Sequence, residues 1–142
     1  MKITPDTNVL VRAVVRDDLA QARAADSVLK DASVIALSMP CLCEFVWVLR
    51  RVYGLTAPDI AAAIRTLLAT ETVHADEEWV EAGLRMLEAG GDFADAVIAE
   101  EGVRRGGETF VSFDKQAVAL LTKQGYSARL PRKGGARPAR KG

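Results

Sequence analysis

Four acidic residues occupy positions where carboxylates can do chemistry together. Asp6 ends a short apolar run at the start of the chain, and Asp114 ends the apolar run "TFVSF". Glu44 lies at the start of a strongly apolar helical pattern, and Asp95 lies in another, three residues after a fifth acid, Asp92. Several carboxylates in one crevice raise each other's pKa values, and a divalent cation removes that repulsion.

The residue types indicate a hard cation. Mg²⁺ and Mn²⁺ prefer oxygen ligands, whereas zinc favours histidine and cysteine. The sequence has one histidine, His74, and we interpret Cys41 and Cys43 as reduced, buried thiols. A cation held by few carboxylates keeps positions open for phosphate oxygens and activates bound water. The acids therefore suggest metal-assisted hydrolysis of a phosphodiester.

Each acid also has a purely structural interpretation. Asp6 is suited to cap a helix that begins near Asn8, and Asp114 to cap the pattern that follows it. Asp92 is a plausible N-cap with Asp95 three residues later, as in a capping box. Glu44 would favour the dipole of its helix at the N-terminal end. Both interpretations stay open from the sequence alone.

Short strand patterns alternate with helical ones along the chain. Helices are predicted at 8–15, 20–32, 40–54, 56–70, 76–91, 92–107 and 115–125, and strands at 2–5, 33–38, 71–76, 108–114 and 126–131. Strands separated by helices pair in parallel through right-handed crossovers. With the first strand central, this gives an α/β fold, a three-layer α/β/α sandwich with a parallel sheet. If the strands ending at Asp6 and Asp114 are neighbours, their carboxylates meet at the switch point of that sheet.

Composition is that of an ordinary globular domain, which we place at residues 1–130. No apolar run reaches the ~18 residues of a membrane span, and no signal peptide is evident, so we expect no membrane contact and a cytoplasmic protein. Residues 129–142 hold six of the 19 basic residues, which leaves 13 basic against 19 acidic residues in the remainder. Residues 131–142 are expected to form a basic tail without fixed structure, which either attracts nucleic acid or has no role.

Four segments together resemble a known family. They are "DTNVLVR" from Asp6, "EFVWVLRRVYGL" from Glu44, "DFADAVIA" from Asp92 and "FVSFD" ending at Asp114. In this order and spacing they are similar to the PIN-domain ribonucleases, and most of all to the VapC-type toxins of prokaryotic toxin–antitoxin pairs. The resemblance extends over residues 1 to about 130 and implies a PIN fold and a Mg²⁺- or Mn²⁺-dependent endoribonuclease.

The resemblance also assigns roles residue by residue. It implies metal binding by Asp6, Asp95 and Asp114, with Glu44 as the fourth catalytic acid. Supporting roles fall to three residues. Asn8 would orient the carboxylate of Asp6, Ser112 would line the site, and Asp92 would lie beside the ligands.

One departure from the family pattern is Pro5, directly before Asp6, where an apolar β-forming residue is usual. Proline lacks a backbone donor, so we expect the first strand to be short or bent. The resemblance further implies an RNA substrate, a cognate antitoxin and a homodimer. Arg12, Arg16, Arg50 and Arg51 are candidates for RNA or partner contacts, and the apolar patterns "FVWVLRRVYGL" and "IAAAIRTLLA" are candidates for partner surfaces, although core packing explains such patterns without a partner.

Two other functions fit parts of this pattern. One is a catalytically silent PIN-like module that binds in a complex. The other is a phosphatase with an aspartyl nucleophile, which would want a second Asp two residues after the first, where this chain has Asn8.

Overall fold

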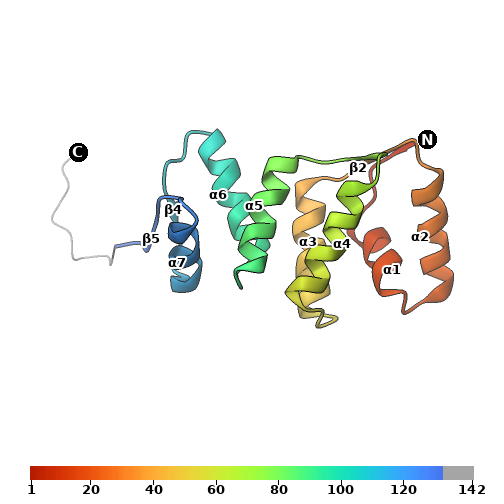
Figure 1. Ribbon diagram of the computed structural model, residues 1–142, viewed down its shortest axis with the longest axis horizontal. Helices are drawn as coiled ribbons and strands as arrows, with labels where there is room; N and C mark the ends of the chain where they lie inside the picture. The colour runs from red at the N-terminus through yellow and green to blue at the C-terminus, as the bar shows by residue number, and fades with distance from the viewer. Residues whose placement is uncertain (133–142) are drawn as a thin grey trace.

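The computed structural model describes residues 1–132, and residues 133–142, most of the predicted basic tail, lie outside the described part. Figure 1 shows α1 and α2 at one end of the molecule, β4, α7 and β5 at the other, and α3 to α6 between them. In chain order the elements are β1 (Lys2–Ile3), α1 (Thr7–Val15), α2 (Leu19–Asp31), β2 (Val34–Ala36), α3 (Met39–Arg51), α4 (Ala57–Ala69), β3 (Val73–His74), α5 (Glu77–Glu88), α6 (Phe93–Arg104), β4 (Phe110–Val111), α7 (Lys115–Lys123) and β5 (Ala128–Arg129).

Every strand pairing in the described residues is parallel, which confirms the predicted α/β class. The fold is mostly helical and consistent with a three-layer sandwich. The strands form a three-stranded sheet of order β1-β2-β3 and a two-stranded sheet of β4 and β5. In β1, Lys2 and Ile3 pair with Val34 and Ile35 of β2.

The first strand differs from the prediction in length and place. It has two residues instead of four, and it lies at an edge of its sheet instead of at the centre. Pro5 supplies no backbone N–H, and Asp6 already caps the following helix, so pairing stops before them. In the described residues β4 pairs with β5 alone, and therefore β1 and β4 are not neighbours.

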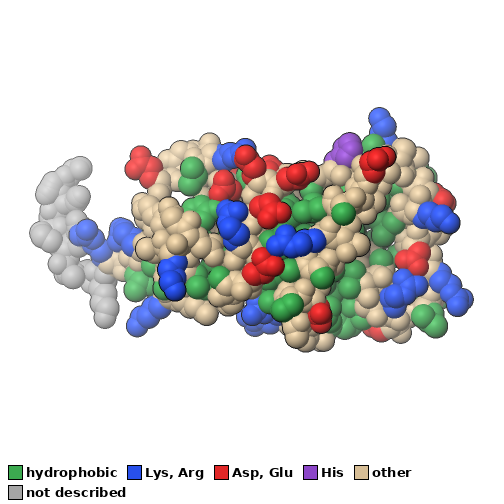
Figure 2. Space-filling model, in the orientation of Figure 1, with side chains coloured by type: hydrophobic (Ala, Val, Ile, Leu, Met, Phe, Trp, Pro, Cys, Tyr) green, Lys and Arg blue, Asp and Glu red, His purple; other side chains and the backbone are tan. Residues whose placement is uncertain are grey.

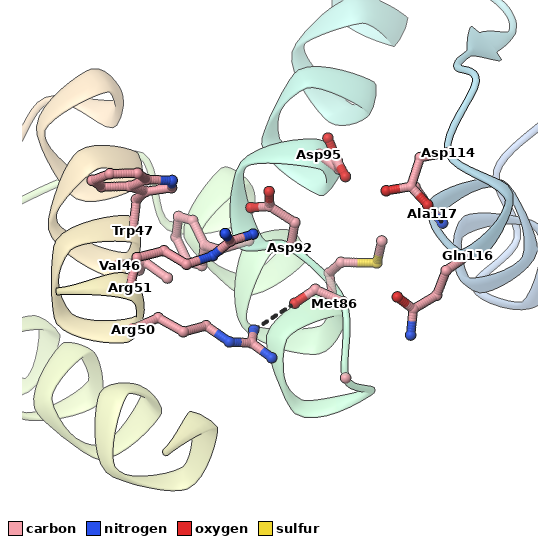
Figure 3. Close-up of a pocket in the computed structure, with 13 residues that line it drawn as sticks. Val46, Trp47, Arg50, Arg51, Met86, Asp92, Asp95, Asp114, Gln116 and Ala117 are labelled. Atoms are coloured by element: carbon pink, nitrogen blue, oxygen red, sulfur yellow. Dashed lines mark hydrogen bonds between the residues drawn. The ribbon is translucent and has the colours of Figure 1, made fainter. Parts of the chain in front are cut away.

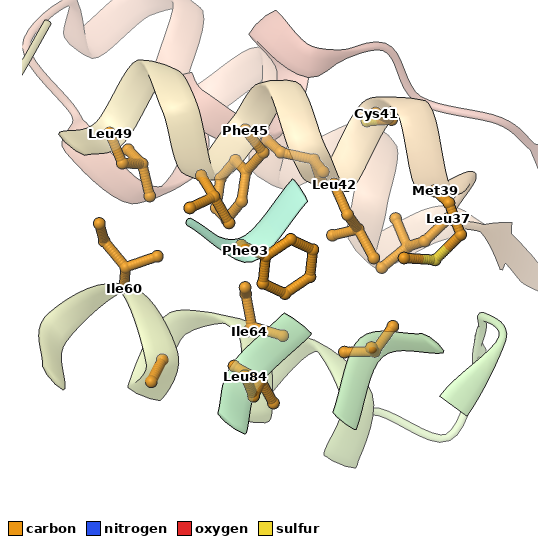
Figure 4. Close-up of a cluster of buried hydrophobic side chains, with 14 of the residues drawn as sticks. Leu37, Met39, Cys41, Leu42, Phe45, Leu49, Ile60, Ile64, Leu84 and Phe93 are labelled. Carbon is orange, nitrogen blue, oxygen red and sulfur yellow. The ribbon is translucent and has the colours of Figure 1, made fainter. Parts of the chain in front are cut away.

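The main core is formed by buried side chains of α1, β2, α3, α4, α5 and the start of α6. Figure 4 shows the ring of Phe93 among side chains of α3, α4 and α5, and the ring is fully buried. A Cβ atom on Gly83 of α5 would lie 2.5 Å from the nearest atom of this ring, so the ring packs directly on the α5 backbone. Phe93 is the first residue of α6, and its burial fixes the start of that helix.

A second, smaller core joins α7 to α5 and α6. Its buried members are mostly small residues of the three helices, with Met86 and Leu121 as the larger ones.

The described residues contain no helix that is both long enough and apolar enough to cross a membrane. Cys41 and Cys43 are free thiols, as predicted, with Cys41 buried and Cys43 partly exposed.

Candidate active site

The start of α6 presents two of the predicted acids. Asp92 is the N-cap of α6, and its Oδ1 accepts a hydrogen bond of 2.9 Å from the backbone N–H of Ala94. Asp95 lies one turn further, at the position where a carboxylate favours the positive end of the helix dipole. Buried Phe93 anchors this turn to the main core, so both carboxylates have a rigid support.

The start of α7 presents a third acid. Asp114 is the N-cap of α7, and its Oδ1 accepts a hydrogen bond of 3.0 Å from the N–H of Ala117. The N–H of Asp114 donates to the hydroxyl oxygen of Ser112 at 3.0 Å, so Ser112 shapes the turn that positions Asp114. Buried Ala117 and Leu121 hold α7 against the second core.

These acids face a pocket of about 300 Å³ between α3, the α5–α6 turn and α7. Figure 3 shows the carboxylates of Asp95 and Asp114 pointing toward one another, with Trp47 and Arg51 on the opposite side. The lining residues are Val46, Trp47, Arg50, Arg51, Met86, Gly90, Gly91, Asp92, Phe93, Asp95, Asp114, Gln116 and Ala117.

The pocket perturbs the ionisation of Asp95. Burial, and then the negative charges of Asp92 and Asp114, raise the pKa of Asp95 to about 6. Near neutral pH the charged form of Asp95 is therefore disfavoured by its surroundings, and a bound cation would relieve this. Burial and the charge of Asp92 also raise the pKa of Cys43 to about 11, so this thiol stays protonated and is a poor metal ligand.

A hydrogen bond from α3 holds one wall of the pocket in place. The guanidinium of Arg50 donates to the carbonyl oxygen of Gly91 at 3.1 Å. A Cβ atom on Gly91 would lie 2.7 Å from the methyl carbon of Met86 and 2.9 Å from Leu120. A side chain at this position would therefore require the ends of Met86 and Leu120 to shift, and the turn carries Asp92 into the pocket.

The remaining predicted acids form a second group beside α1. Asp6 is exposed and caps α1 by accepting from the N–H of Asn8 at 2.8 Å. The contact between Asn8 and this carboxylate is therefore made by the backbone N–H of Asn8. Glu44, also exposed, accepts from the hydroxyl of buried Thr7 at 2.5 Å.

The structure thus brings together Asp92, Asp95 and Asp114, and it leaves Asp6 and Glu44 outside the lining of their pocket. The expected meeting of all four acids in one crevice is not seen in the described residues. The physical reason is the pairing of the strands, because β1 and β4 belong to different sheets and their carboxyl ends are not adjacent. The role of Asp6 as a third ligand stays a prediction.

The donor set in the pocket fits a hard cation. Within residues 1–132 no three His, Cys, Asp or Glu side chains are arranged to hold a metal ion among them. Mg²⁺ is commonly bound through one or two carboxylates together with waters and substrate phosphates. The facing pair Asp95 and Asp114, with oxygen donors only, matches that mode.

Sequence reasoning missed two polar or aromatic residues of the pocket. The sequence places Trp47 in an apolar pattern that fits either the core or a partner surface, and it does not single out Gln116. The available signal was the helical spacing of Trp47 with Arg50 and Arg51, which places all three on one side of α3.

Comparison with known proteins identifies the family. No curated protein matches the chain significantly. The family model described as PIN domain matches residues 3–120, which is most of the chain and includes every predicted acid. PIN domains are typically nucleases and generally use divalent metal ions. The chain belongs to the PIN domain family.

Proposed function

We propose that this PIN domain is an endoribonuclease that depends on Mg²⁺ or Mn²⁺. The observation that carries the proposal is the pair Asp95 and Asp114, which face each other across a pocket that also contains Asp92. The raised pKa of Asp95 supports it, because perturbed carboxylates in a concave site are typical of catalytic centres.

Asp95 and Asp114 would hold the cation, which when bound lowers the pKa of water and stabilises negative charge on a phosphate. The protein contributes fixed carboxylates. The capping bond of Asp114 uses Oδ1, and no group of residues 1–132 donates a hydrogen bond to its Oδ2. Asp92 is fixed through Oδ1 in the same manner. Glu44 and Asp6 are retained as proposed catalytic acids on the strength of the motif resemblance.

The biological setting is also a proposal. The motifs resemble those of VapC-type toxins, which supports a role as the toxin of a toxin–antitoxin pair in the cytoplasm. In that role the protein would form a homodimer and bind a cognate antitoxin that covers the acidic pocket. Mixing the purified chain with the product of an adjacent small gene would test the pairing, since a genuine antitoxin should form a complex and suppress RNA cleavage.

The activity itself is tested by incubating the full chain with total RNA and Mn²⁺, with and without a chelator. We expect cleavage that the chelator abolishes, with 5′-phosphate and 3′-hydroxyl ends. Asp95→Asn should remove the activity while the far-UV circular dichroism spectrum stays unchanged. An Asp95→Asn variant that cuts RNA as fast as the parent would show that the site is assigned wrongly.

A second candidate is a PIN domain that binds in a complex without cleaving. The observation in its favour is that no three acidic, histidine or cysteine side chains of residues 1–132 are grouped for a metal ion. Titration with Mn²⁺ separates the two functions, because a silent module would neither bind the cation in this pocket nor cut RNA at any concentration of it.

A further inference from the structure

A stripe of exposed side chains runs along α3 to the pocket. Glu44, Trp47 and Arg51 are spaced three and four residues apart, so they lie on one face of the helix. We call these three residues the α3 stripe. All three are exposed, whereas Phe45 and Leu49 on the opposite face are fully buried. The stripe begins at the acid group of Asp6 and Glu44 and ends at the pocket.

Trp47 is 55% exposed and lines the pocket. Leaving so large an apolar ring in water gives up the free energy that burial would provide, so the ring is available to an external partner. The second tryptophan behaves differently. Trp79 is partly buried, and the guanidinium of Arg104 lies over its ring at 5.8 Å from the centroid.

Arg51 is available for an external anion. None of the ion pairs recorded in residues 1–132 includes it, although Asp92 and Asp95 line the same pocket. Its neighbour Arg50 is occupied with the carbonyl of Gly91. In Figure 3 the side chain of Arg51 extends along the pocket wall from the same helix as Trp47.

The pocket offers a third kind of contact. Gln116 of α7 is exposed at the far side and carries an amide that both donates and accepts hydrogen bonds. An aromatic face, a free guanidinium and an amide match the groups of an unpaired nucleotide, which are a base plane, a phosphate and a hydrogen-bonding base edge.

We propose that the α3 stripe is the binding surface for single-stranded RNA, with Trp47 stacked on an unpaired base and Arg51 bound to its phosphate. This assignment rests on the proposed nuclease function and adds to it the side chains that hold the RNA beside the pocket. Stacking requires an accessible base plane, which a duplex does not present. Bound along the stripe, the strand passes from Glu44 to the pocket of Asp95 and so contacts both acid groups.

The test uses fluorescence of the full chain carrying Trp79→Phe, in which Trp47 is the sole tryptophan. A chelator is present, so that no metal-dependent cleavage occurs. The chain is titrated with single-stranded RNA of about 12 nucleotides, with DNA of the same sequence, and with duplex RNA. We expect saturable quenching by single-stranded RNA and little quenching by the duplex. Equal quenching by single-stranded DNA would mean that the α3 stripe binds both kinds of single strand. Stronger quenching by RNA would indicate a contact to the 2′-hydroxyl of the ribose.

Variants of the parent chain then measure the contribution of each group by fluorescence anisotropy of a labelled RNA. Trp47→Ala should weaken binding by about 5- to 100-fold, as loss of one stacked base does, whereas Trp47→Phe should keep most of the affinity. Arg51→Ala should weaken binding and reduce the slope of log affinity against log salt by about 0.7. Val52→Ala is the matched control and should leave affinity unchanged, because Val52, the C-cap of α3, is 62% exposed and lies outside the pocket lining.

Parental RNA affinity in Trp47→Ala would overturn the proposal, as would equal binding of duplex RNA. A shift of Trp47→Ala from dimer to monomer with unchanged RNA affinity would instead assign this face to contact between copies. These outcomes are separable from those of the nuclease proposal, because binding is measured without metal. If RNA quenches the fluorescence of Trp47 but the chain cuts no RNA when Mn²⁺ is added, the nuclease proposal is wrong and the α3 stripe still binds RNA. If Trp47→Ala cuts RNA as fast as the parent, the nuclease proposal stands and the assignment of the α3 stripe is wrong.

Discussion

At the scale of single residues, the acids of this chain have two roles at once. Asp6, Asp92 and Asp114 each cap a helix through one carboxylate oxygen, as their structural interpretation predicted. Capping fixes the side chain and leaves the second oxygen for a ligand, so the capping and catalytic interpretations do not compete. Asp95 makes no capping bond and is the acid whose pKa is raised.

The raised pKa of Asp95 predicts how stability depends on pH. Its pKa is about 6 in the folded chain and about 3.9 when unfolded, so the folded state binds more protons between these values. In a chelator, the free energy of unfolding should therefore fall as pH rises from about 4 to 6. Asp95→Asn should remove this fall and be more stable near neutral pH by an amount of order 1 kcal/mol, since solvent screens a partly exposed group.

Urea unfolding of both proteins across this pH range checks the prediction. The same substitution should abolish RNA cleavage, so one change would raise stability and remove activity. If Asp95→Asn were less stable than the parent near neutral pH, the burial of a charged carboxylate beside Asp92 and Asp114 would not explain the raised pKa.

At the scale of elements, helix starts position the site. α6 is tied to the main core through Phe93 at its first residue, and α7 to the second core through Ala117 and Leu121. The sequence predicted every helix and strand that carries a site residue, because Pro, Gly and capping residues mark the boundaries well. Asp114 was correctly placed after its strand and at the start of α7.

Asp114 allows its two roles to be separated by a pair of variants. Asp114→Asn keeps a good N-cap and loses the charge, so it should fold as stably as the parent and lose cleavage. Asp114→Ala should lose cleavage and also about 1 kcal/mol of stability. Thermal unfolding and an RNA cleavage assay of both variants are the measurements. Full activity in Asp114→Asn would leave this residue with a capping role alone.

Two glycines test how α5 positions α6. Gly83→Ala would bring its Cβ within 2.5 Å of the ring of Phe93, and we expect a loss of about 1–3 kcal/mol from overpacking. Gly102→Ala, in α6 with no atom within 4 Å of its Cβ, should gain about 0.5–1 kcal/mol from helix propensity. Urea unfolding measures both, and equal effects would mean that Phe93 does not pack on α5 as described.

At the scale of the whole molecule, the arrangement of strands decides which acids meet. The alternation of strands and helices correctly predicted parallel pairing, but it carries no information on which strands are adjacent. The partner of β1 depends on contacts between residues far apart in sequence, and Pro5 shortens the strand that would have been central. For that reason the sequence predicted one crevice with four acids, and the structure has two groups joined by α3.

Both signs of charge are interspersed on the face shown in Figure 2, so the acidic pocket is a local feature.

Asp6→Asn tests whether the group outside the pocket takes part in the reaction. Asparagine also caps helices, so α1 should form normally and the melting temperature should stay close to that of the parent. The motif resemblance predicts a loss of RNA cleavage comparable to that of Asp95→Asn. Parental cleavage rates would leave Asp6 as a helix cap with no part in catalysis.

The most direct test of the central claim is the position of a bound cation. When a crystal of the protein is soaked in Mn²⁺, the strongest peak in the anomalous difference map marks the position of the bound manganese ion. The account predicts a peak in the pocket, with Asp95 and Asp114 as its protein ligands, and loss of that peak in Asp95→Asn. A peak at acids away from this pocket, or none at all at saturating Mn²⁺, would contradict the account.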